Sequence, residues 1–135
     1  MAMLRFPTDL KYVKEASKKV LDFLSDIKVD ESSLFDIKLC FEEAFINAVK
    51  YGNKFNEQLT IDVDIIKKPD TIEIVVCDQG EGFDFKHCED PTKKGNITKT
   101  HGRGIFLIKN LMDQIQYKRN GSCLHMIKKI KRATK

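Results

Sequence analysis

Four polar side chains between residues 41 and 53 have the types and the spacing to bind a charged ligand together. Glu43, Asn47, Lys50 and Tyr51 follow one another at i, i+4, i+7 and i+8, so in a helix they lie close together on one side. A carboxylate, a carboxamide, an ammonium and a phenol then converge on a small volume. Taken alone, a polar helix side is more often a solvated face, so the interpretation depends on other segments.

A second candidate segment, Asp78–Phe83, follows a run that alternates like a strand. Asp78 can accept a hydrogen bond from an exocyclic amine in a dry pocket. Glycines at 80 and 82 would let a base ring lie against the backbone, because no Cβ stands in the way. Two glycines after a strand more often form only a turn. The chain contains neither a dinucleotide fingerprint, which needs a surrounding βαβ unit, nor a G-x-x-x-x-G-K-[ST] phosphate loop.

The third candidate segment, Gly102-Arg103-Gly104, leads directly into a helical pattern. Backbone N–H groups at a helix N-terminus preceded by glycines form a natural seat for phosphate oxygens. The alternative is a flexible hinge before an ordinary helix start. Chance composition rarely gives all three segments in one short chain, so together they favour a nucleotide site.

Hydrophobic periodicity predicts the helices that position these groups. Apolar residues at three- and four-residue spacing predict a helix over about residues 32–51, namely Ile37, Phe41, Ala44, Phe45 and Ala48. Residues 30–33 offer its N-cap, and Gly52 is expected to end it as a C-terminal glycine. An earlier helix is predicted over about 9–26, starting at Thr8 or Asp9 after a short extended lead at 4–7.

Alternating patterns predict four strands. Runs at 59–65 and 72–76 around a turn at 67–70 form a hairpin whose second strand delivers Asp78 to its end. Residues 84–101 are polar and without period, which is typical of a lid. After a helix from Gly102, runs at 115–118 and 122–128 flank Asn120-Gly121, a strong hairpin signal. The order predicts an α/β (α+β) two-layer sandwich with a mostly antiparallel mixed sheet and helices on one face.

Composition places the chain among soluble globular proteins of one domain. It has 135 residues, 41% hydrophobic and 33% charged, with a formal net charge of +4. No signal peptide or membrane span is expected, so the predicted location is the cytoplasm. A basic run at 128–135 is expected to be a frayed, solvated tail, because a nucleic-acid binder would show a basic stripe interleaved with aromatics.

The four cysteines are scattered, with no C-x-x-C pair. This spacing argues against a zinc site and against a disulfide framework. Cys40 and Cys77 lie in apolar segments and are expected to be small core residues. His87 beside Cys88 has no second pair to complete a metal site, so loop chemistry is expected there.

The three segments resemble, in order and spacing, the N-box, G1 box and G2 box of the GHKL ATPase superfamily. The resemblance covers about residues 5–130 and implies the Bergerat ATP-binding fold. The short chain and the run Gly102–Asp113 resemble the bacterial anti-sigma factor serine kinases, which bind a sigma factor and phosphorylate a serine of an antagonist protein. The resemblance therefore implies ATP and Mg²⁺ as ligands, those two proteins as partners, and a homodimer.

The resemblance also implies roles for the N-box residues. Glu43 corresponds to the general base and Asn47 to the Mg²⁺ ligand that holds the ion against the phosphates. Lys50 and Tyr51 depart from the His-Gly often found in the serine kinases and resemble the Lys-Tyr of histidine-kinase catalytic domains. Lys50 can still neutralise phosphate charge.

In the other two boxes, the resemblance implies that Asp78 recognises the adenine base. It implies that the remaining box residues shape the pocket or bind the phosphates as the lid closes. The implied pocket and phosphate residues are Gly80, Gly82, Phe83, Gly102, Arg103, Gly104 and Ile105. Arg103 is in place to touch either the phosphates or a bound partner.

The predicted function is an ATP-dependent protein serine kinase that also acts as a binding switch on a sigma factor. One alternative is a module that uses nucleotide only to set its shape and sequesters a partner. Another is the catalytic half of a split histidine kinase, although His87, His101 and His125 fall in the predicted lid, loop and strand and provide no phosphoacceptor helix. Neither a direct nucleic-acid contact nor a membrane contact is expected.

Overall fold

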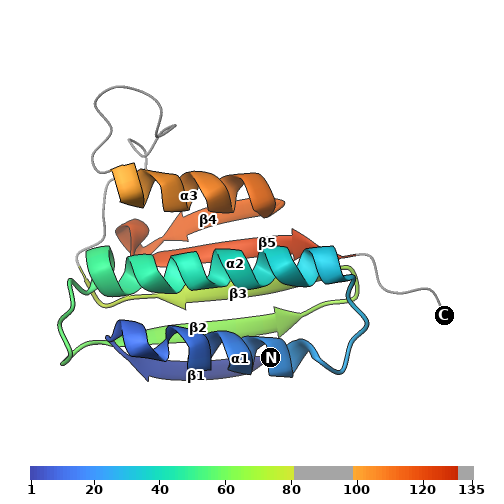
Figure 1. Ribbon diagram of the computed structural model, residues 1–135, viewed down its shortest axis with the longest axis horizontal. Helices are drawn as coiled ribbons and strands as arrows, with labels where there is room; N and C mark the ends of the chain where they lie inside the picture. The colour runs from blue at the N-terminus through green and yellow to red at the C-terminus, as the bar shows by residue number, and fades with distance from the viewer. Residues whose placement is uncertain (81–98, 131–135) are drawn as a thin grey trace.

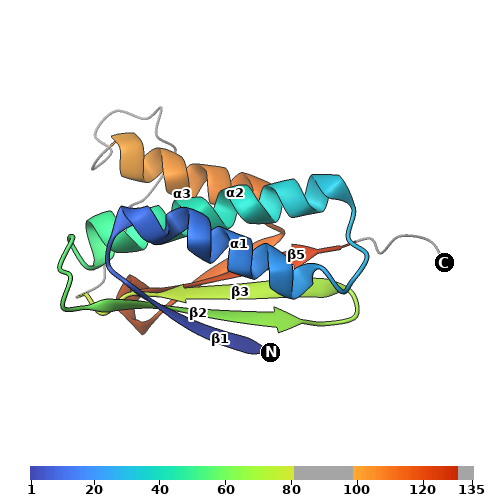
Figure 2. The same ribbon diagram turned by 60° about the horizontal axis from the view of Figure 1, so that its bottom comes forward.

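One antiparallel sheet with helices on a single face forms the described part of the chain. The computed structural model describes residues 1–80 and 99–130, with side chains in the second range from Gly104 onward. In chain order the elements are β1 (Ala2–Pro7), a 3-10 turn η1 (Leu10–Tyr12), α1 (Val13–Leu24), α2 (Glu31–Asn47), a π-helical turn η2 (Ala48–Gly52), β2 (Thr60–Lys67), β3 (Thr71–Cys77), α3 (Lys99–Leu111), β4 (Gln114–Lys118), a 3-10 turn η4 (Arg119–Gly121) and β5 (Cys123–Lys129). All three helices lie on the same side of the sheet (Figures 1 and 2). The predicted two-layer α+β class is therefore confirmed.

The sheet has the strand order β1-β2-β3-β5-β4. Each of its four described pairings is antiparallel, so the expectation of a mixed sheet is wrong. The expected extended lead at 4–7 is a full edge strand that pairs with β2 from Ala2↔Ile65 to Pro7↔Thr60. Its sequence is too short to show an alternating pattern, and pairing with β2 decides its conformation.

Aspartate side chains cap the starts of η1 and α2. The Asp30 carboxylate accepts a hydrogen bond from the Ser33 N–H at 3.0 Å, which satisfies one unpaired donor of the first turn of α2. Asp9 caps η1 in the same way, through the Lys11 N–H at 2.9 Å. The predicted N-cap of α2 is confirmed, whereas α1 itself begins only at Val13, after η1 and with no side-chain cap at Tyr12.

The Asn120-Gly121 hairpin is also confirmed. Arg119, Asn120 and Gly121 have φ of 52°, 57° and 91°. Positive φ values of this kind let a tight β-hairpin turn match the right-handed twist of the strands that it joins. Gly121 adopts it without steric cost. The turn carries Ser122 and Cys123 back alongside the end of β3.

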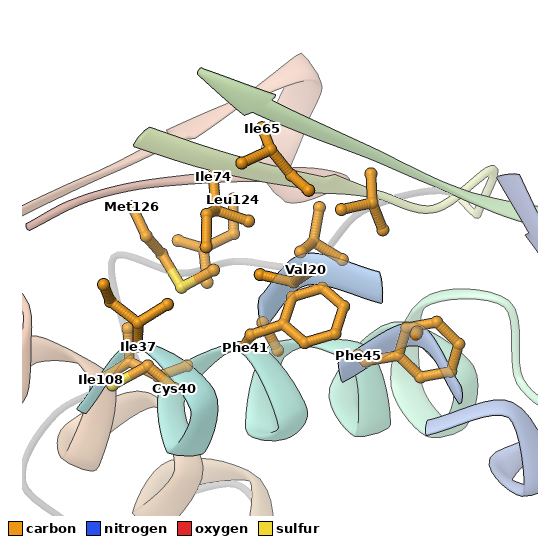
Figure 3. Packing of buried hydrophobic residues seen from close by; sticks show 14 of the residues in the cluster. Val20, Ile37, Cys40, Phe41, Phe45, Ile65, Ile74, Ile108, Leu124 and Met126 are labelled. Atoms are coloured by element: carbon orange, nitrogen blue, oxygen red, sulfur yellow. The ribbon is translucent and has the colours of Figure 1, made fainter. Parts of the chain in front are cut away.

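The core lies between the helices and the sheet. The predicted stripe of α2 is buried, and Phe41 and Phe45 are fully inaccessible. The Phe45 ring meets Phe6 edge-on with the ring centroids 5.8 Å apart, in a favourable aromatic geometry. Side chains from α2 face Ile74 and Met126 of the sheet (Figure 3). This packing fixes the rotation of α2, and hence where its polar side points.

Two cysteine expectations differ in outcome. Cys40 is a buried free thiol, and burial raises its pKa to about 12. The expectation that Cys77 is a core thiol is wrong, because Cys77 and Cys123 form a disulfide across β3 and β5. The spacing of the cysteines along the sequence does not predict this disulfide, because Cys77 and Cys123 become neighbours only through the register of β3 and β5.

The predicted basic tail begins later than expected. Lys128 and Lys129 belong to β5. The Lys128 ammonium donates to Asp36 at 3.0 Å and to the Leu111 carbonyl at 2.7 Å, so it links α2, the end of α3 and the sheet. Residues 131–135 lie outside the described residues.

Candidate nucleotide-binding site

Three elements bring the candidate residues to one end of the molecule. The C-terminal end of α2, the end of β3 and the N-terminal part of α3 lie at the same end of the sandwich (Figure 1). A cavity opens between them. Its lining includes Asn47, Tyr51, Gly52, Asp78, Ile105 and Ser122. The predicted convergence of the helix side, the strand end and the later helix is therefore present.

Asp78 lies just beyond β3 at the wall of this cavity. It is 7% exposed, and one carboxylate oxygen accepts the Gly80 N–H at 2.8 Å. Its own N–H donates to the Ser122 carbonyl at 2.8 Å. Burial raises the pKa of the Asp78 carboxyl, and the Gly80 N–H and the Arg119 charge offset part of that rise. A buried acceptor of this kind can select an amine donor on a ligand.

Gly52 and Gly80 let the helix end approach Asp78 closely. A Cβ on Gly52 would lie 2.2 Å from Asp78 Oδ2, and a Cβ on Gly80 would lie 2.0 Å from the Gly52 carbonyl oxygen. No side chain fits at either position. The tight turn expected around Gly80 is thus a packed contact between β3 and the end of the helix.

The predicted role of Gly52 as a C-terminal cap is wrong. The helix continues as the π-helical turn η2, where the Asn53 N–H donates to the Ala48 carbonyl at 2.8 Å. The left-handed residues that end it are Lys54 and Phe55, with φ of 50° and 60°. Single π-turns of this kind are frequent at functional sites, and this one turns Tyr51 and Gly52 into the cavity wall.

Gly104 packs directly on the polar side of α2. A Cβ at Gly104 would lie 3.0 Å from Glu43 Oε2 and 3.1 Å from Asn47 Nδ2. Glu43, the predicted catalytic carboxylate, and Asn47, the predicted metal ligand, therefore lie against Gly104. The next residue, Ile105, is buried. Tyr51 lines the cavity, whereas Lys50, although half-buried, is not part of that lining as far as the described residues go.

The start of α3 corrects one predicted boundary. Residues 99–101 are already helical in the described part of α3, so they belong to the helix and not to the expected lid at 84–101. Gly102 and Arg103 lie within the helix; Gly82, Phe83 and the rest of the expected lid lie outside the described residues.

Comparisons with known proteins agree with this geometry. The sequence pattern of the histidine kinase-like ATPase domain matches residues 6–128. The chain belongs to that family. It is 33% identical to the serine-protein kinase RsbW of Staphylococcus epidermidis, over 96% of this chain and 86% of the relative. It is 30% identical to RsbW of Staphylococcus aureus strain MSSA476, with the same coverage of both chains.

Solved structures show the same fold at lower sequence identity. The RsbU and RsbW domains of a Mycobacterium tuberculosis protein match with a TM-score of 0.60 and 12% identity, covering 100% of this chain and 34% of that one. The catalytic domain of histidine kinase ThkA matches with a TM-score of 0.57 and 14% identity, covering 98% of this chain and 100% of that one. The family match and the RsbW relatives confirm the resemblance to the GHKL superfamily and to its anti-sigma factor serine kinases. The histidine kinase-like ATPase domain is an ATP-using, kinase-like fold.

The donor set of this histidine kinase-like ATPase domain suits a lightly held Mg²⁺. Asn47 offers a carboxamide oxygen beside the Glu43 carboxylate, and both are hard oxygen donors. Across residues 1–80 and 104–130, no three His, Cys, Asp or Glu side chains are grouped to hold a metal. Mg²⁺ commonly takes one or two protein oxygens and completes its shell with water and substrate phosphates, so the residues present fit such an ion.

Sequence reasoning missed two residues of this site. Gly52 was assigned to helix termination, and Asn53 was given no role. Asn53 is 2% exposed and makes three side-chain hydrogen bonds. A polar residue directly after Gly52 carried no local signal of burial, because its partners are 7, 26 and 45 residues away in sequence.

Proposed function

We propose that the chain is an ATP-dependent serine-protein kinase that transfers the γ-phosphate to a serine of an anti-sigma antagonist and also binds a sigma factor. One observation carries the proposal: Gly104 packs against Glu43 and Asn47, and Asn47 lines the same cavity as the buried Asp78. Groups suited to phosphate chemistry thus lie beside a group suited to reading a base. The serine-protein kinase relatives, matched over nearly the whole chain, support the choice of reaction.

In the proposed mechanism, Asp78 accepts a hydrogen bond from the adenine amine and Gly80 leaves room for the ring. Asn47 would hold Mg²⁺, which when bound neutralises charge on the phosphate oxygens. Glu43 accepts the proton of the serine hydroxyl as the serine oxygen bonds to the γ-phosphorus and the bond to the ADP oxygen breaks. Such a transfer depends mainly on positioning and electrostatic stabilisation, which the rigid α2 face can provide.

The test is phosphate transfer from labelled ATP to a candidate antagonist. Glu43→Gln is expected to keep ATP binding and to lower transfer by about 10²-fold or more, because the proton acceptor is lost. The matched control is Glu42→Gln on the same helix, since Glu42 pairs on the surface with Lys38 at 3.2 Å and has no proposed role. Asn47→Ala is expected to abolish Mg-ATP binding.

Full transfer activity in Glu43→Gln would show that Glu43 is structural. Unchanged Mg-ATP affinity in Asn47→Ala would remove the metal assignment. Nucleotide binding without any transfer would favour the alternative of a nucleotide-gated module that sequesters its partner. Transfer to a histidine of a separate chain would favour a split histidine kinase, the alternative suggested by Lys50-Tyr51.

Several expectations accompany this proposal. Residues 1–135 act as a single histidine kinase-like ATPase domain whose lid, expected at about 84–101 and now without the α3 residues 99–101, closes over the nucleotide. Gly82, Phe83, Gly102 and Arg103 contact the nucleotide, and Lys50 neutralises phosphate charge. The chain works as a homodimer in the cytoplasm; none of the described helices is long and apolar enough to cross a membrane.

A further inference from the structure

Asn53 connects three separate parts of the chain at the base end of the cavity. Its Nδ2 donates to Thr8 Oγ1 at 2.8 Å and to the Thr60 carbonyl at 3.0 Å. Its Oδ1 accepts the Gln79 N–H at 2.8 Å. The side chain therefore ties the end of β1, the start of β2 and the turn after β3 to the end of η2.

The two ends of the Asn53 amide have different partners. Both Nδ2 protons are used, toward Thr8 and Thr60, while the oxygen faces the Gln79 N–H. A carboxylate at this position lacks both donors, and a hydroxyl has only one. The chemistry of the amide is therefore matched to these three contacts, and its burial makes each of them costly to lose.

The third contact acts on the residue next to the base reader. Gln79 directly follows Asp78, and Gly52, which directly precedes Asn53, abuts the Asp78 carboxylate. The helix end thus touches the Asp78–Gly80 turn twice, once through the Gly52 backbone and once through the Asn53 amide. Gln79 completes the connection, because its Oε1 accepts the Thr60 N–H at 2.6 Å.

We infer that Asn53 is a positioning residue that sets the base selectivity of the site by holding the Asp78–Gly80 turn against the helix end. The inference rests on the proposed function. Asn53 itself does not line the cavity among the described residues, so it acts through Asp78. A site that hydrogen-bonds a ligand amine discriminates strongly only while its buried acceptor is held in place.

The experiment measures the affinities of the full chain for ATP, ADP and GTP with magnesium. Asn53→Ala is expected to reduce the ratio of ATP to GTP affinity by about tenfold or more. ATP and ADP affinities should fall by the same factor, because Asn53 contacts the turn that holds Asp78 and not Glu43 or Asn47, the groups proposed to act on the phosphates. In the transfer assay, KM for ATP should rise while kcat stays near the wild-type value.

Thr8→Val is the matched control. Thr8 is 1% exposed and belongs to the same network, through Asn53 and the Leu59 carbonyl at 2.7 Å, but it contacts the Nδ2 of Asn53 and not the Oδ1 that holds Gln79. It should lower Tm and leave the ATP to GTP ratio unchanged. Asn53→Asp keeps the shape and the acceptor for Gln79 and serves as a second variant if Asn53→Ala does not fold; it should retain more selectivity than Asn53→Ala.

An unchanged ratio in folded Asn53 variants would overturn the inference, as would an equal loss of ratio in Thr8→Val. Both outcomes leave the proposed function standing, since the wild-type chain would still bind ATP. If the wild-type chain bound no adenine nucleotide, the proposed function would fall and the inference with it.

Discussion

At the scale of single residues, Asp78 shows that a site group can oppose the stability of the fold. Its carboxyl is buried beside the Gly52 backbone, and burial raises its pKa above 3.8. The folded state then binds a proton more tightly than the unfolded state does, so stability falls as pH rises through the interval between 3.8 and the folded pKa. Above that interval the Asp78 carboxylate is ionised in both states, and the loss in the free energy of unfolding has reached its maximum.

Asp78→Asn is therefore expected to raise stability at pH 7 while removing nucleotide binding. The amide keeps an oxygen for the Gly80 N–H but presents no carboxylate to a base amine. The gain in the free energy of unfolding should be on the order of 1 kcal/mol, a common size for a single stabilising substitution. Thermal unfolding at several pH values measures it, and the difference from wild type should shrink as the pH falls through the folded pKa.

Glu73 is the control for that experiment. Its carboxylate lies on the sheet face opposite the helices and contacts Lys68 and His125, and the Lys68 hydrogen bond lowers its pKa. A depressed pKa contributes stability at neutral pH that is lost as pH falls from 4.5 through the folded pKa. Glu73→Gln should thus be less stable than wild type at pH 7, and equal gains in both variants would contradict the argument.

At the scale of elements, two glycines set how closely neighbouring elements approach α2. Gly52 lets the end of the helix meet β3 at Asp78, and Gly104 lets α3 meet Glu43 and Asn47. In the proposed function, the first contact holds the group that reads the base and the second holds the groups that act on the phosphates. Substituting each with alanine therefore separates the two halves of the site.

Gly52→Ala is expected to weaken ATP binding by about tenfold or more, because its Cβ would displace the Asp78 carboxylate and a small displacement at a site is costly. Gly104→Ala, with a Cβ at 3.0 Å from Glu43 Oε2, should mainly slow phosphate transfer. Nucleotide titration and single-turnover transfer measure the two effects, and each variant is the control for the other. Identical behaviour of the two variants would mean that the glycines act only through stability.

At the scale of the whole molecule, the Cys77–Cys123 disulfide joins the two central neighbours β3 and β5 across 46 residues of sequence. The loop that it closes contains the expected lid and all of α3 and β4. A cross-link of this span constrains the unfolded chain, and the chain-entropy model assigns it roughly 4 kcal/mol of stability. Disulfides are rare in the reducing cytoplasm, so the bond is the feature of this fold that conflicts with the proposed location.

Reduction with a dithiol is expected to lower the Tm of the wild-type chain by several degrees. The corresponding loss in the free energy of unfolding should be at most roughly 4 kcal/mol. The Cys77→Ser/Cys123→Ser double variant should start at the lower Tm and not respond to the dithiol. Cys40→Ser controls for the buried free thiol and should respond like wild type. A wild-type Tm that is insensitive to reduction would show that the two thiols do not pair in the purified protein.

The sequence by itself determined the helices, the central strands and the site candidates that face one another. The apolar stripe of α2 and the alternation of β2 and β3 follow from local geometry and burial, so they fixed which side of α2 carries Glu43 and Asn47. The same reasoning put Asp78 at the end of a rigid strand. These features depend on neighbours a few residues apart, which the chain displays directly.

Only the tertiary structure decided the contacts between distant segments. Strand register made Cys77 and Cys123 neighbours, and the approach of β3 to the helix end gave Gly52 and Asn53 their places beside Asp78. Pairing with β2 turned residues 2–7 into an edge strand. The physical reason is that these contacts form when separate layers pack, so the residue types alone do not reveal which partner each one meets.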